Sequence, residues 1–268
     1  MLGAIIGDLA GSIYEYEQIK NVKPVQIKNI IEASSFYSDD TILTTAIADA
    51  ILNKKDYGDT LREWALRYQN YKPDHKPYFK TTFSPNFTKW ANSNDVGSSS
   101  GNGAMMRVSP VGFLFDTEKD VIENARLATI PSHNSEDAVI GATLVALIIF
   151  YARNGMNKDE IIQKLNIEIK EPNIKQFNFT CNDSIDVCLY SLFNSKSFED
   201  SIRLAISFGG DTDTNACIVG SMAEALYGIS PQLKKLAISK LPNDINKILN
   251  QYNQAMAEKI NNYKTISS

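Results

Sequence analysis

The sequence predicts an all-α protein, folded as a single compact bundle of many helices around one core. Apolar residues recur at intervals of three and four along several segments, which is the spacing of one face of a helix. Period-two alternation of apolar and polar residues, the pattern of half-buried strands, is scarce. Hydrophobic residues make up 43% and charged residues 22% of the chain, which excludes a disordered, collagen-like or coiled-coil protein. These observations favour a helical bundle over alternating strand–helix units.

Four segments carry the helical spacing, and each predicts a helix: residues 41–52, 138–151, 216–226 and 233–241. The segment 138–151 is apolar on nearly every face, so we expect it to be buried in the core. It is the longest apolar run and falls short of the roughly 20 residues that a membrane helix needs. Residues 168–170 are the only short strand that the pattern suggests.

Three stretches interrupt the helical pattern. Residues 20–35 are polar and mixed, and residues 154–180 show no apolar periodicity of any length. Residues 71–103 contain prolines and aromatic residues and end in the run GSSSGNG; long ordered loops of this kind are usually functional. The acidic motifs described below lie at opposite ends of the chain, so we expect residues 1–268 to form one domain.

Charge and residue counts limit the chemistry. The chain has 27 Lys and Arg against 31 Asp and Glu, a net charge of -4, which argues against a general nucleic-acid binder. Its two histidines exclude Cys/His zinc fingers and three-histidine zinc sites, so any metal must be held by oxygen. The three cysteines lack the spacing of a disulfide framework, and the start of the chain lacks the basic residues of a signal peptide. We therefore expect a cytoplasmic protein without a membrane or nucleic-acid partner.

An acidic pair stands directly before the first predicted helix, in the sequence Ser38-Asp39-Asp40-Thr41. Ser and Asp at a helix start accept backbone N–H bonds and are favoured by the helix dipole, so capping is one interpretation. Capping needs a single oxygen, however, and a second carboxylate repels the first. The pair therefore suggests a role beyond capping.

A second acidic motif, GGDTDTN at residues 209–215, leads into the helix predicted at 216–226. Asp211 and Asp213 alternate with hydroxyl residues after a glycine pair that permits a tight turn, and the lysine of a P-loop is missing. Carboxylates and hydroxyls suit Mg²⁺ or Mn²⁺. Four carboxylates that converge without a cation would repel one another strongly, so the two acidic helix starts suggest a site for two divalent ions.

Three further segments carry polar groups of interest. In GDLAGSIYE at residues 7–15, Asp8 and Glu15 are seven positions apart and are expected on one face of a helix, where a solvated surface is the simpler interpretation. The run SSSGNGAMMR at residues 98–107 has the composition of an anion-binding nest, although such runs are more often simple turns. His133 follows a serine, and a lone histidine is more often structural than catalytic.

Together these motifs resemble the ADP-ribosylglycohydrolase family, which includes the dinitrogenase-reductase-activating glycohydrolases. The resemblance extends from Gly3 to about Gly228 and rests on GDLAGSIYE, SDDT, GNGAMMR, SH and GGDTDTN, in this order. It implies an orthogonal all-α bundle of that family's type, holding two Mg²⁺ or Mn²⁺ ions. It also implies hydrolysis of a glycosidic bond of ADP-ribose.

The resemblance assigns roles by position. The implied metal ligands are Ser38, Asp39, Asp40, Asp211, Asp213 and Thr214. The implied contacts to the diphosphate and the distal ribose of the substrate are Ser99, Gly101, Asn102, Gly103 and His133. Glu15 corresponds to a family glutamate that reaches the metal site or the ribose, and Asp40 and Glu15 are alternatives for the catalytic carboxylate that manages the proton. The family usually has Thr at the position of Ser38, and many members carry an aromatic residue at that of Ser100.

The expected reaction is metal-dependent hydrolysis at the anomeric carbon of ADP-ribose, with arginine as the default acceptor. The substrate is expected to be an ADP-ribosylated protein or a small-molecule adduct; serine, nucleic-acid and O-acyl acceptors stay open. Substrate specificity is expected to depend on aromatic residues of the segment 71–94, namely Tyr78, Phe79, Phe83, Phe87 and Trp90. The alternative is that these side chains only pack the segment onto the core. The alternatives are a catalytically silent ADP-ribose-binding relative, a magnesium-dependent nucleotide phosphohydrolase, and a helical protein whose acids only cap. We expect a monomer.

Overall fold

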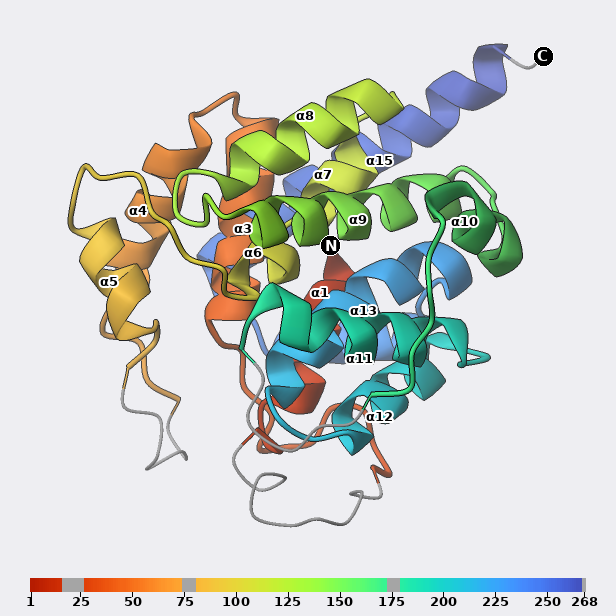
Figure 1. Ribbon diagram of the computed structural model, residues 1–268, viewed down its shortest axis with the longest axis horizontal. Coiled ribbons are helices and arrows are strands. Elements are labelled where there is room, and N and C mark those ends of the chain that lie inside the picture. The colour runs from red at the N-terminus through yellow and green to blue at the C-terminus, as the bar shows by residue number, and fades with distance from the viewer. Residues whose placement is uncertain (16–26, 74–80, 173–178, 267–268) are drawn as a thin grey trace.

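The structure is a bundle of helices with no sheet in the part of the chain that it describes. The computed structural model describes residues 1–15, 27–73, 81–172 and 179–266 (Figure 1). Its helices are α1 (Leu2–Gly11), α3 (Asp39–Leu52), α4 (Tyr57–Tyr68), α5 (Pro85–Ala91), α6 (Gly103–Met106), α7 (Ser109–Leu114), α8 (Glu118–Thr129), α9 (Glu136–Arg153), α10 (Lys158–Leu165), α11 (Cys181–Phe193), α12 (Phe198–Ser207), α13 (Thr212–Tyr227), α14 (Pro231–Ser239) and α15 (Asn243–Ile266). The prediction of an all-α fold is confirmed.

The pairing of extended segments is limited to isolated contacts. Among the described residues, isolated β-bridges join Ser98 to His133 and Gly101 to Thr180. The prediction of a short strand at residues 168–170 is wrong, because these residues form no strand and take part in neither of the two bridges.

The four helices predicted from apolar spacing are all present, as α3, α9, α13 and α14. The helix α14 ends at Ser239 and not at Leu241 as predicted. The prediction that residues 138–151 are buried also holds for most of α9, whose side chains from Val145 to Ala152 are all buried.

Two short helices lie inside the stretches 71–103 and 154–180, which interrupt the helical pattern of the sequence. The helix α5 begins at Pro85, and the Ser84 side chain caps it by accepting a hydrogen bond from the backbone N–H of Phe87 (3.2 Å). The helix α10 begins with a capping box between Asn157 and Glu160. With 7 and 8 residues, both helices are too short to show apolar periodicity, so their caps were the only sequence signal.

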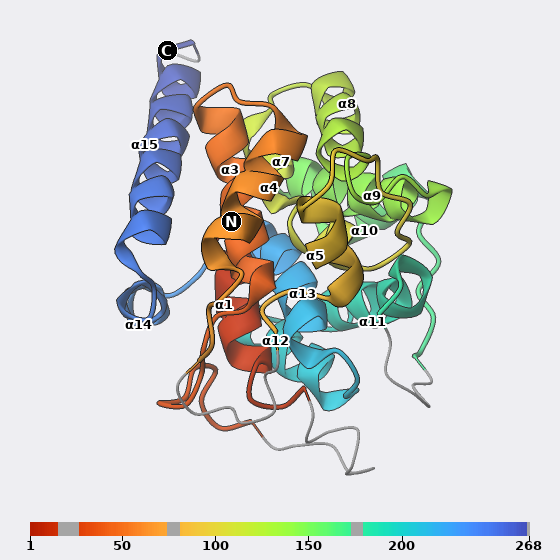
Figure 2. The same cartoon turned by 90° about the vertical axis from the view of Figure 1, so that its left-hand side faces the viewer.

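The helices α1 and α13 lie side by side at the centre of the bundle (Figures 1 and 2). Gly3, Gly7 and Gly11, one helical turn apart, form the face of α1 that touches α13. A Cβ atom on Gly7 would lie 1.9 Å from the carbonyl oxygen of Ala216, and one on Gly11 would lie 2.2 Å from that of Thr212. The absence of side chains at these glycines therefore sets how closely the two backbones approach.

The remaining helices surround this central pair. The helix α9 crosses α13 and carries α7 and α8 on its other side (Figure 1). The helices α11 and α12 cover another side of α13, while α3 packs against α1, α4 and α15 (Figure 2). None of the helices in the described ranges is both long and apolar enough to cross a membrane.

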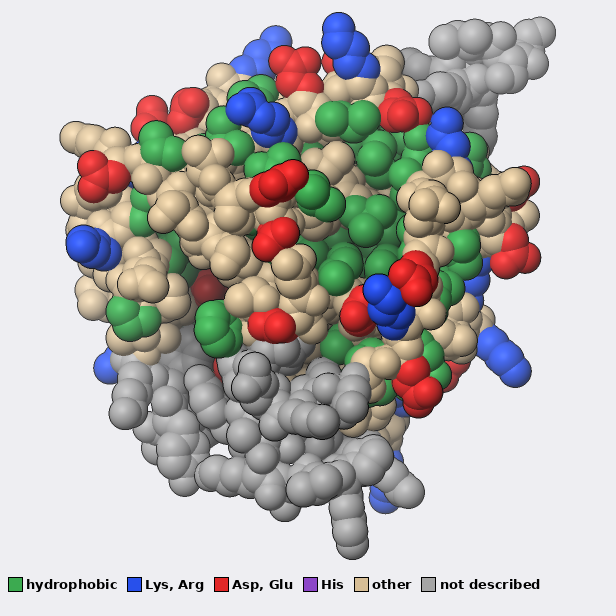
Figure 3. Space-filling model, viewed as in Figure 1, with side chains coloured by type: hydrophobic (Ala, Val, Ile, Leu, Met, Phe, Trp, Pro, Cys, Tyr) green, Lys and Arg blue, Asp and Glu red, His purple; other side chains and the backbone are tan. Residues whose placement is uncertain are grey.

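The charged side chains that can be seen on one face of the molecule are scattered and of both signs, around an apolar area near its centre (Figure 3). The visible, described part of this face has no continuous basic stripe of the kind that a nucleic-acid binder presents.

The helices α3 and α4 are joined through one buried carboxylate. Asp49 Oδ2 accepts hydrogen bonds from Trp64 Nε1 (2.9 Å) and Lys55 Nζ (3.0 Å), and Oδ1 accepts one from Asn53 Nδ2 (2.7 Å). Burial alone would raise the pKa of Asp49, but these three donors outweigh it and hold the pKa below its usual value. The carboxylate is therefore held in its charged form by the fold.

We predict that Gly7→Ala strongly destabilises the protein. The added methyl group has no space against the backbone of α13, so the helices must separate, at a cost of about 3 kcal/mol or more. Chemical denaturation of both variants measures this. Gly58→Ala is the matched control, since that helical glycine has no atom closer than 3.2 Å to the added Cβ, and we expect it to be close to neutral. A Gly7→Ala variant as stable as the wild type contradicts the packing argument.

We predict that Asp49→Asn destabilises the protein by about 1–2 kcal/mol at pH 7, because charge-assisted hydrogen bonds are lost. The pKa of Asp49 is lowered by folding, so its contribution is complete above the unfolded pKa of about 4 and disappears as the pH falls through the folded pKa. Denaturation of both proteins from pH 7 downward should show the difference shrinking below about pH 4. The exposed Asp59→Asn change in α4 is the control, and a difference that is constant with pH contradicts the assignment.

Candidate active site

The two acidic helix starts face each other across the floor of one cavity. Thr214, in the first turn of α13, donates a hydrogen bond from Oγ1 to Asp40 Oδ2 at the start of α3 (3.2 Å). Carboxylate oxygens of Asp8, Asp40 and Asp213 lie within 4.8 Å of one another, and so do those of Glu15, Asp211 and Asp213. The two groups of three carboxylates therefore share Asp213 and form one continuous cluster.

Asp8 is buried and holds the start of α3 in place from the neighbouring helix α1. Its Oδ2 accepts hydrogen bonds from the backbone N–H groups of Ser38 (2.9 Å) and Thr41 (3.1 Å) and from the Thr41 hydroxyl. Its Oδ1 lies 2.8 Å from the Ser38 hydroxyl. The expected solvated face at Asp8 is thus wrong. Glu15 is not on the same helical face either, because α1 ends at Gly11 and Glu15 lies in the turn that follows.

The aspartates of the site hold their protons more tightly than usual, Asp211 included. Burial raises the pKa of Asp8 to about 6, although hydrogen bonds from Ser38 and Thr41 oppose this. Burial and then the charges of Asp8 and Asp211 raise the pKa of Asp39 to about 8. The pKa values of Asp40 and Asp213 are raised well above the usual range by burial and by the surrounding carboxylates. The fold therefore concentrates negative charge that only a counter-charge or bound protons can neutralise.

One carboxylate oxygen of the cluster has no donor. Asp40 Oδ2 lies within hydrogen-bond distance of the hydroxyls of Ser38 (3.1 Å) and Thr214 (3.2 Å), whereas the buried Oδ1 has no hydrogen-bond partner among the described residues. Leaving a buried carboxylate oxygen without a partner is costly. An oxygen-only set of carboxylates and hydroxyls with such an orphaned atom fits a hard divalent cation such as Mg²⁺ or Mn²⁺.

The glycine-rich loop before α6 is tied to the second acidic motif. Asn102 Nδ2 donates hydrogen bonds to Asp211 Oδ2 (2.8 Å) and to Ser184 Oγ (3.0 Å). The backbone N–H of Asn102 donates to the carbonyl of Phe179 (2.9 Å), and the Ser99 hydroxyl accepts from the N–H of Gly101 (3.0 Å). Asn102 thus orients Asp211 and fixes the loop at the edge of the carboxylate cluster.

His133 packs under the same loop. Its Nε2 would lie 3.2 Å from a Cβ on Gly103 and 3.5 Å from one on Gly101, so only glycines leave this ring edge uncovered. The Ser98–His133 bridge holds the two segments together. Burial and the charge of Arg107 hold the pKa of His133 well below its usual value, so the imidazole is neutral.

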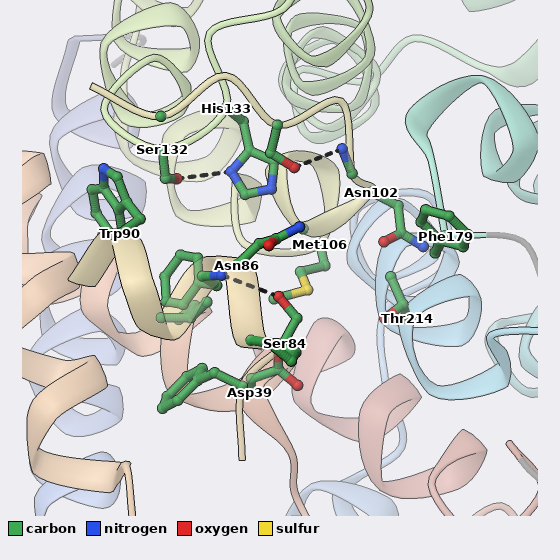
Figure 4. A pocket seen from close by; sticks show the side chains of 18 of the residues that line it. Asp39, Ser84, Asn86, Trp90, Asn102, Met106, Ser132, His133, Phe179 and Thr214 are labelled. Atoms are coloured by element: carbon green, nitrogen blue, oxygen red, sulfur yellow. Dashed lines mark hydrogen bonds between the residues drawn. The ribbon is translucent and has the colours of Figure 1, made fainter. Parts of the chain in front are cut away.

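These elements surround a single cavity of about 1200 Å³. In Figure 4, Asn102, Phe179 and Thr214 lie on one side of the cavity and Trp90 on the other, with His133 at one end and Asp39 at the other. The α5 segment lines it with Phe83, Phe87 and Trp90, whose rings contact in sequence at centroid distances of 5.5 and 5.1 Å. Phe83 and Trp90 are buried, so they also pack this wall onto the core. Tyr78 and Phe79 lie outside the described residues.

Comparison with known proteins decides what this cavity belongs to. A sequence model of the family described as ADP-ribosylglycohydrolase matches residues 1–264. The chain belongs to the ADP-ribosylglycohydrolase family. The chain is therefore a hydrolase of glycosidic bonds of ADP-ribose, as the resemblance of its motifs predicts.

Two relatives with descriptive names resemble the chain at low sequence identity. The chain is 24% identical over 267 residues to ADP-ribosylarginine hydrolase Tri1 of Pseudomonas putida (strain GB-1), covering 86% of this chain and 70% of that protein. It is 24% identical over 313 residues to ADP-ribosylhydrolase ARH3 of Mus musculus, covering 85% and 83%. A solved structure titled ADP-ribosylglycohydrolase-related protein complex superposes with a TM-score of 0.70 at 18% identity, covering 95% of this chain and 97% of that one. That likeness confirms the fold.

The cavity of this ADP-ribosylglycohydrolase contains nearly every site residue that the sequence predicts. The cavity-lining members of that set are Glu15, Asp39, Asp40, Ser99, Gly101, Asn102, Gly103, His133, Asp211, Asp213 and Thr214. Ser38 differs, since it is buried beneath the floor, where its hydroxyl contacts Asp8 and Asp40. The role of Asp8 was not predicted from the sequence. Its position beside Gly7, in a run of glycines four residues apart, was the available signal that it is buried.

We predict that Asp40→Asn and Asp213→Asn each weaken divalent-cation binding by about tenfold or more while the helical fold is retained. Both changes remove negative charge that the fold buries, so the metal-free variants should also melt at a higher temperature than the metal-free wild type. Titration calorimetry with Mn²⁺ and thermal melts in EDTA measure the two effects. Asp59→Asn on the surface is the control. If Asp40→Asn and Asp213→Asn bind Mn²⁺ with the affinity of the wild type, the assignment of the metal site is wrong.

Proposed function

We propose that the chain is a metal-dependent hydrolase that cleaves the bond between the anomeric carbon of ADP-ribose and a modified arginine side chain, releasing ADP-ribose. This proposal rests on two features that line the same cavity. A cluster of carboxylates with an unpartnered buried oxygen on Asp40 forms the floor, and the loop from Ser99 to Gly103 lies beside it.

The proposed ligands of two divalent ions, Mg²⁺ or Mn²⁺, are Ser38, Asp39, Asp40, Asp211, Asp213 and Thr214. Asp213 belongs to both carboxylate groups, so it would help to hold either ion. Both oxygens of Asp8 already accept hydrogen bonds from Ser38 and Thr41, so we assign Asp8 to orienting the start of α3. When bound, the ions supply positive charge that neutralises the carboxylates and polarises oxygen atoms of the substrate.

The other residues bind and orient the substrate. The loop of Ser99, Gly101, Asn102 and Gly103 and the neutral ring of His133 form the wall that we assign to the diphosphate and the distal ribose. Bond cleavage at the anomeric carbon builds positive charge on the sugar, which the surrounding carboxylates stabilise. Asp40 and Glu15 both line the cavity, and these are the two carboxylates that we assign to proton transfer.

Arginine as the acceptor is supported by the charge of the cavity. Among the described residues that line it, the acids are Glu15, Asp39, Asp40, Asp95, Asp211 and Asp213, and Lys89 is the only cation. Glu15 and Asp95 are not among the proposed metal ligands, so they leave negative charge that attracts a cationic guanidinium when the ions are bound. The relative from Pseudomonas putida is named an ADP-ribosylarginine hydrolase, which agrees with this choice.

All of the cavity elements described above come from one chain and pack on one core. We therefore also propose that residues 1–268 work as one domain and as a monomer. The proposed substrate is an ADP-ribosylated protein or a smaller ADP-ribosyl adduct.

A panel of substrates tests the proposal. We predict that ADP-ribosyl-arginine peptide releases ADP-ribose in the presence of Mg²⁺ or Mn²⁺, faster than ADP-ribosyl-serine peptide or O-acyl-ADP-ribose does, and that EDTA stops the release. Asp213→Asn should lose activity by about 100-fold or more, while the surface control Asp59→Asn should keep it.

Each other product pattern contradicts the proposal in a defined way. AMP or inorganic phosphate as the product indicates a nucleotide phosphohydrolase. Binding of ADP-ribose without release from any substrate indicates a silent relative. Faster release of ADP-ribose from the serine-linked peptide than from the arginine-linked peptide contradicts the proposed acceptor but not the proposed reaction.

A further inference from the structure

Arg107, the residue that follows α6, is a fully buried cation that forms no ion pair with an acidic side chain among the described residues. Its Nη2 donates to the carbonyls of Ala128 (3.1 Å) and Thr129 (3.4 Å) at the end of α8, and to Ser132 Oγ (2.8 Å). Its Nε and Nη1 have no hydrogen-bond partner in the described part of the chain. Burial lowers the pKa of Arg107 to about 9, so the guanidinium stays charged at neutral pH. Keeping such a charge buried is costly, which calls for a reason beyond packing.

The contacts of Arg107 fix the direction of the next hydrogen bond. Ser132 Oγ lies 2.8 Å from Nδ1 of His133. A guanidinium has only donors, so Arg107 uses an acceptor position of the Ser132 oxygen. The hydroxyl hydrogen of Ser132 then has Nδ1 as its acceptor. If Nδ1 carried a hydrogen instead, that buried hydroxyl would be a donor without an acceptor among the described residues.

A neutral imidazole carries one hydrogen, so an accepting Nδ1 places that hydrogen on Nε2. Nε2 of His133 faces Gly101 and Gly103 at the wall of the cavity, and the only hydrogen bond of the ring to a described residue is the one between Nδ1 and Ser132. Figure 4 shows the ring of His133 at the end of the cavity, joined through Nδ1 to Ser132. The outcome is a rigid N–H donor that lacks an acceptor until a ligand enters.

We propose that Arg107 and Ser132 are positioning residues, which hold His133 as its Nε2–H tautomer so that it donates to an anionic oxygen of the ligand. The nearby guanidinium also adds positive charge behind this donor, which favours an anion at the loop. The identity of the ligand, a nucleoside diphosphate sugar, rests on the function proposed above, whereas the tautomer of His133 follows from the contacts within the protein alone.

The tautomer is tested in the ligand-free protein by ¹⁵N-histidine NMR. The chain has two histidines, so His75→Gln leaves His133 as the only signal. We predict that Nδ1 of His133 is unprotonated and Nε2 protonated at pH 7. We further predict that Ser132→Ala in this background gives a mixture of tautomers. Ser109→Ala is the matched control, since the Ser109 hydroxyl is also buried but has no hydrogen-bond partner in the described chain, and it should leave the spectrum unchanged.

Binding of ADP-ribose, measured by calorimetry, gives the second readout. Ser132→Ala should weaken it about tenfold, the size of one hydrogen bond to a charged group, and Ser109→Ala should not. Arg107→Met provides a second variant, with the same expected loss of tautomer preference. A hydrogen on Nδ1 in the wild type, or a Ser132→Ala protein with unchanged tautomer and affinity, overturns the proposal. If ADP-ribose does not bind the wild type at all, the proposed function fails while the NMR result still decides the tautomer.

Discussion

The close approach of α1 to α13 is the constraint on which the rest of this structure depends. Gly3, Gly7 and Gly11 remove every side chain from one face of α1, and the backbone of α13 occupies the space. Asp8, next to Gly7, is thereby brought to the start of α3. The same contact places the start of α13, with Asp211 and Asp213, beside it. A packing feature made of glycines thus determines where the charges of the site lie.

The cluster that results is unfavourable for folding and useful for chemistry. Buried carboxylates raise one another's pKa values, and one oxygen of Asp40 has no donor in the described chain. Proteins store such unfavourable electrostatics where a ligand relieves it. The rest of the bundle offsets this unfavourable free energy. It does so through an extensive apolar core and through hydrogen bonds from neutral donors to the carboxylates at each acidic helix start. Divalent cations are the counter-charge that this donor set fits best.

The wall of the cavity opposite the carboxylates has a buried positive charge behind it. Arg107 lies behind Ser132 and His133, whereas the carboxylates lie across the cavity at the floor. A ligand with an anionic middle and a sugar that reacts through a cationic centre matches this division. The field of the cavity thus agrees with the family to which the chain belongs.

What the sequence could predict depended on how local each signal is. The helix α9 is apolar around most of its surface, and the acidic pairs at the starts of α3 and α13 each lie within three consecutive residues, so both were found from short windows. The role of Asp8 was not predictable in that way, because its partners Ser38 and Thr41 lie 30 and 33 residues away. Arg107 likewise reads as an ordinary surface cation until tertiary packing surrounds it. Short helices such as α5 and α10 carried only their caps as signals.

The proposed chemistry depends above all on the binding of two divalent ions by the carboxylate cluster. Diffraction from crystals grown with Mn²⁺, recorded at the manganese absorption edge, tests it most directly, because anomalous scattering locates the metal without reference to activity. We predict two anomalous peaks at the cavity floor, both within ligand distance of Asp213 and one of them beside the unpartnered oxygen of Asp40. Well-ordered carboxylates with no anomalous peak between them, in crystals saturated with Mn²⁺, would contradict it.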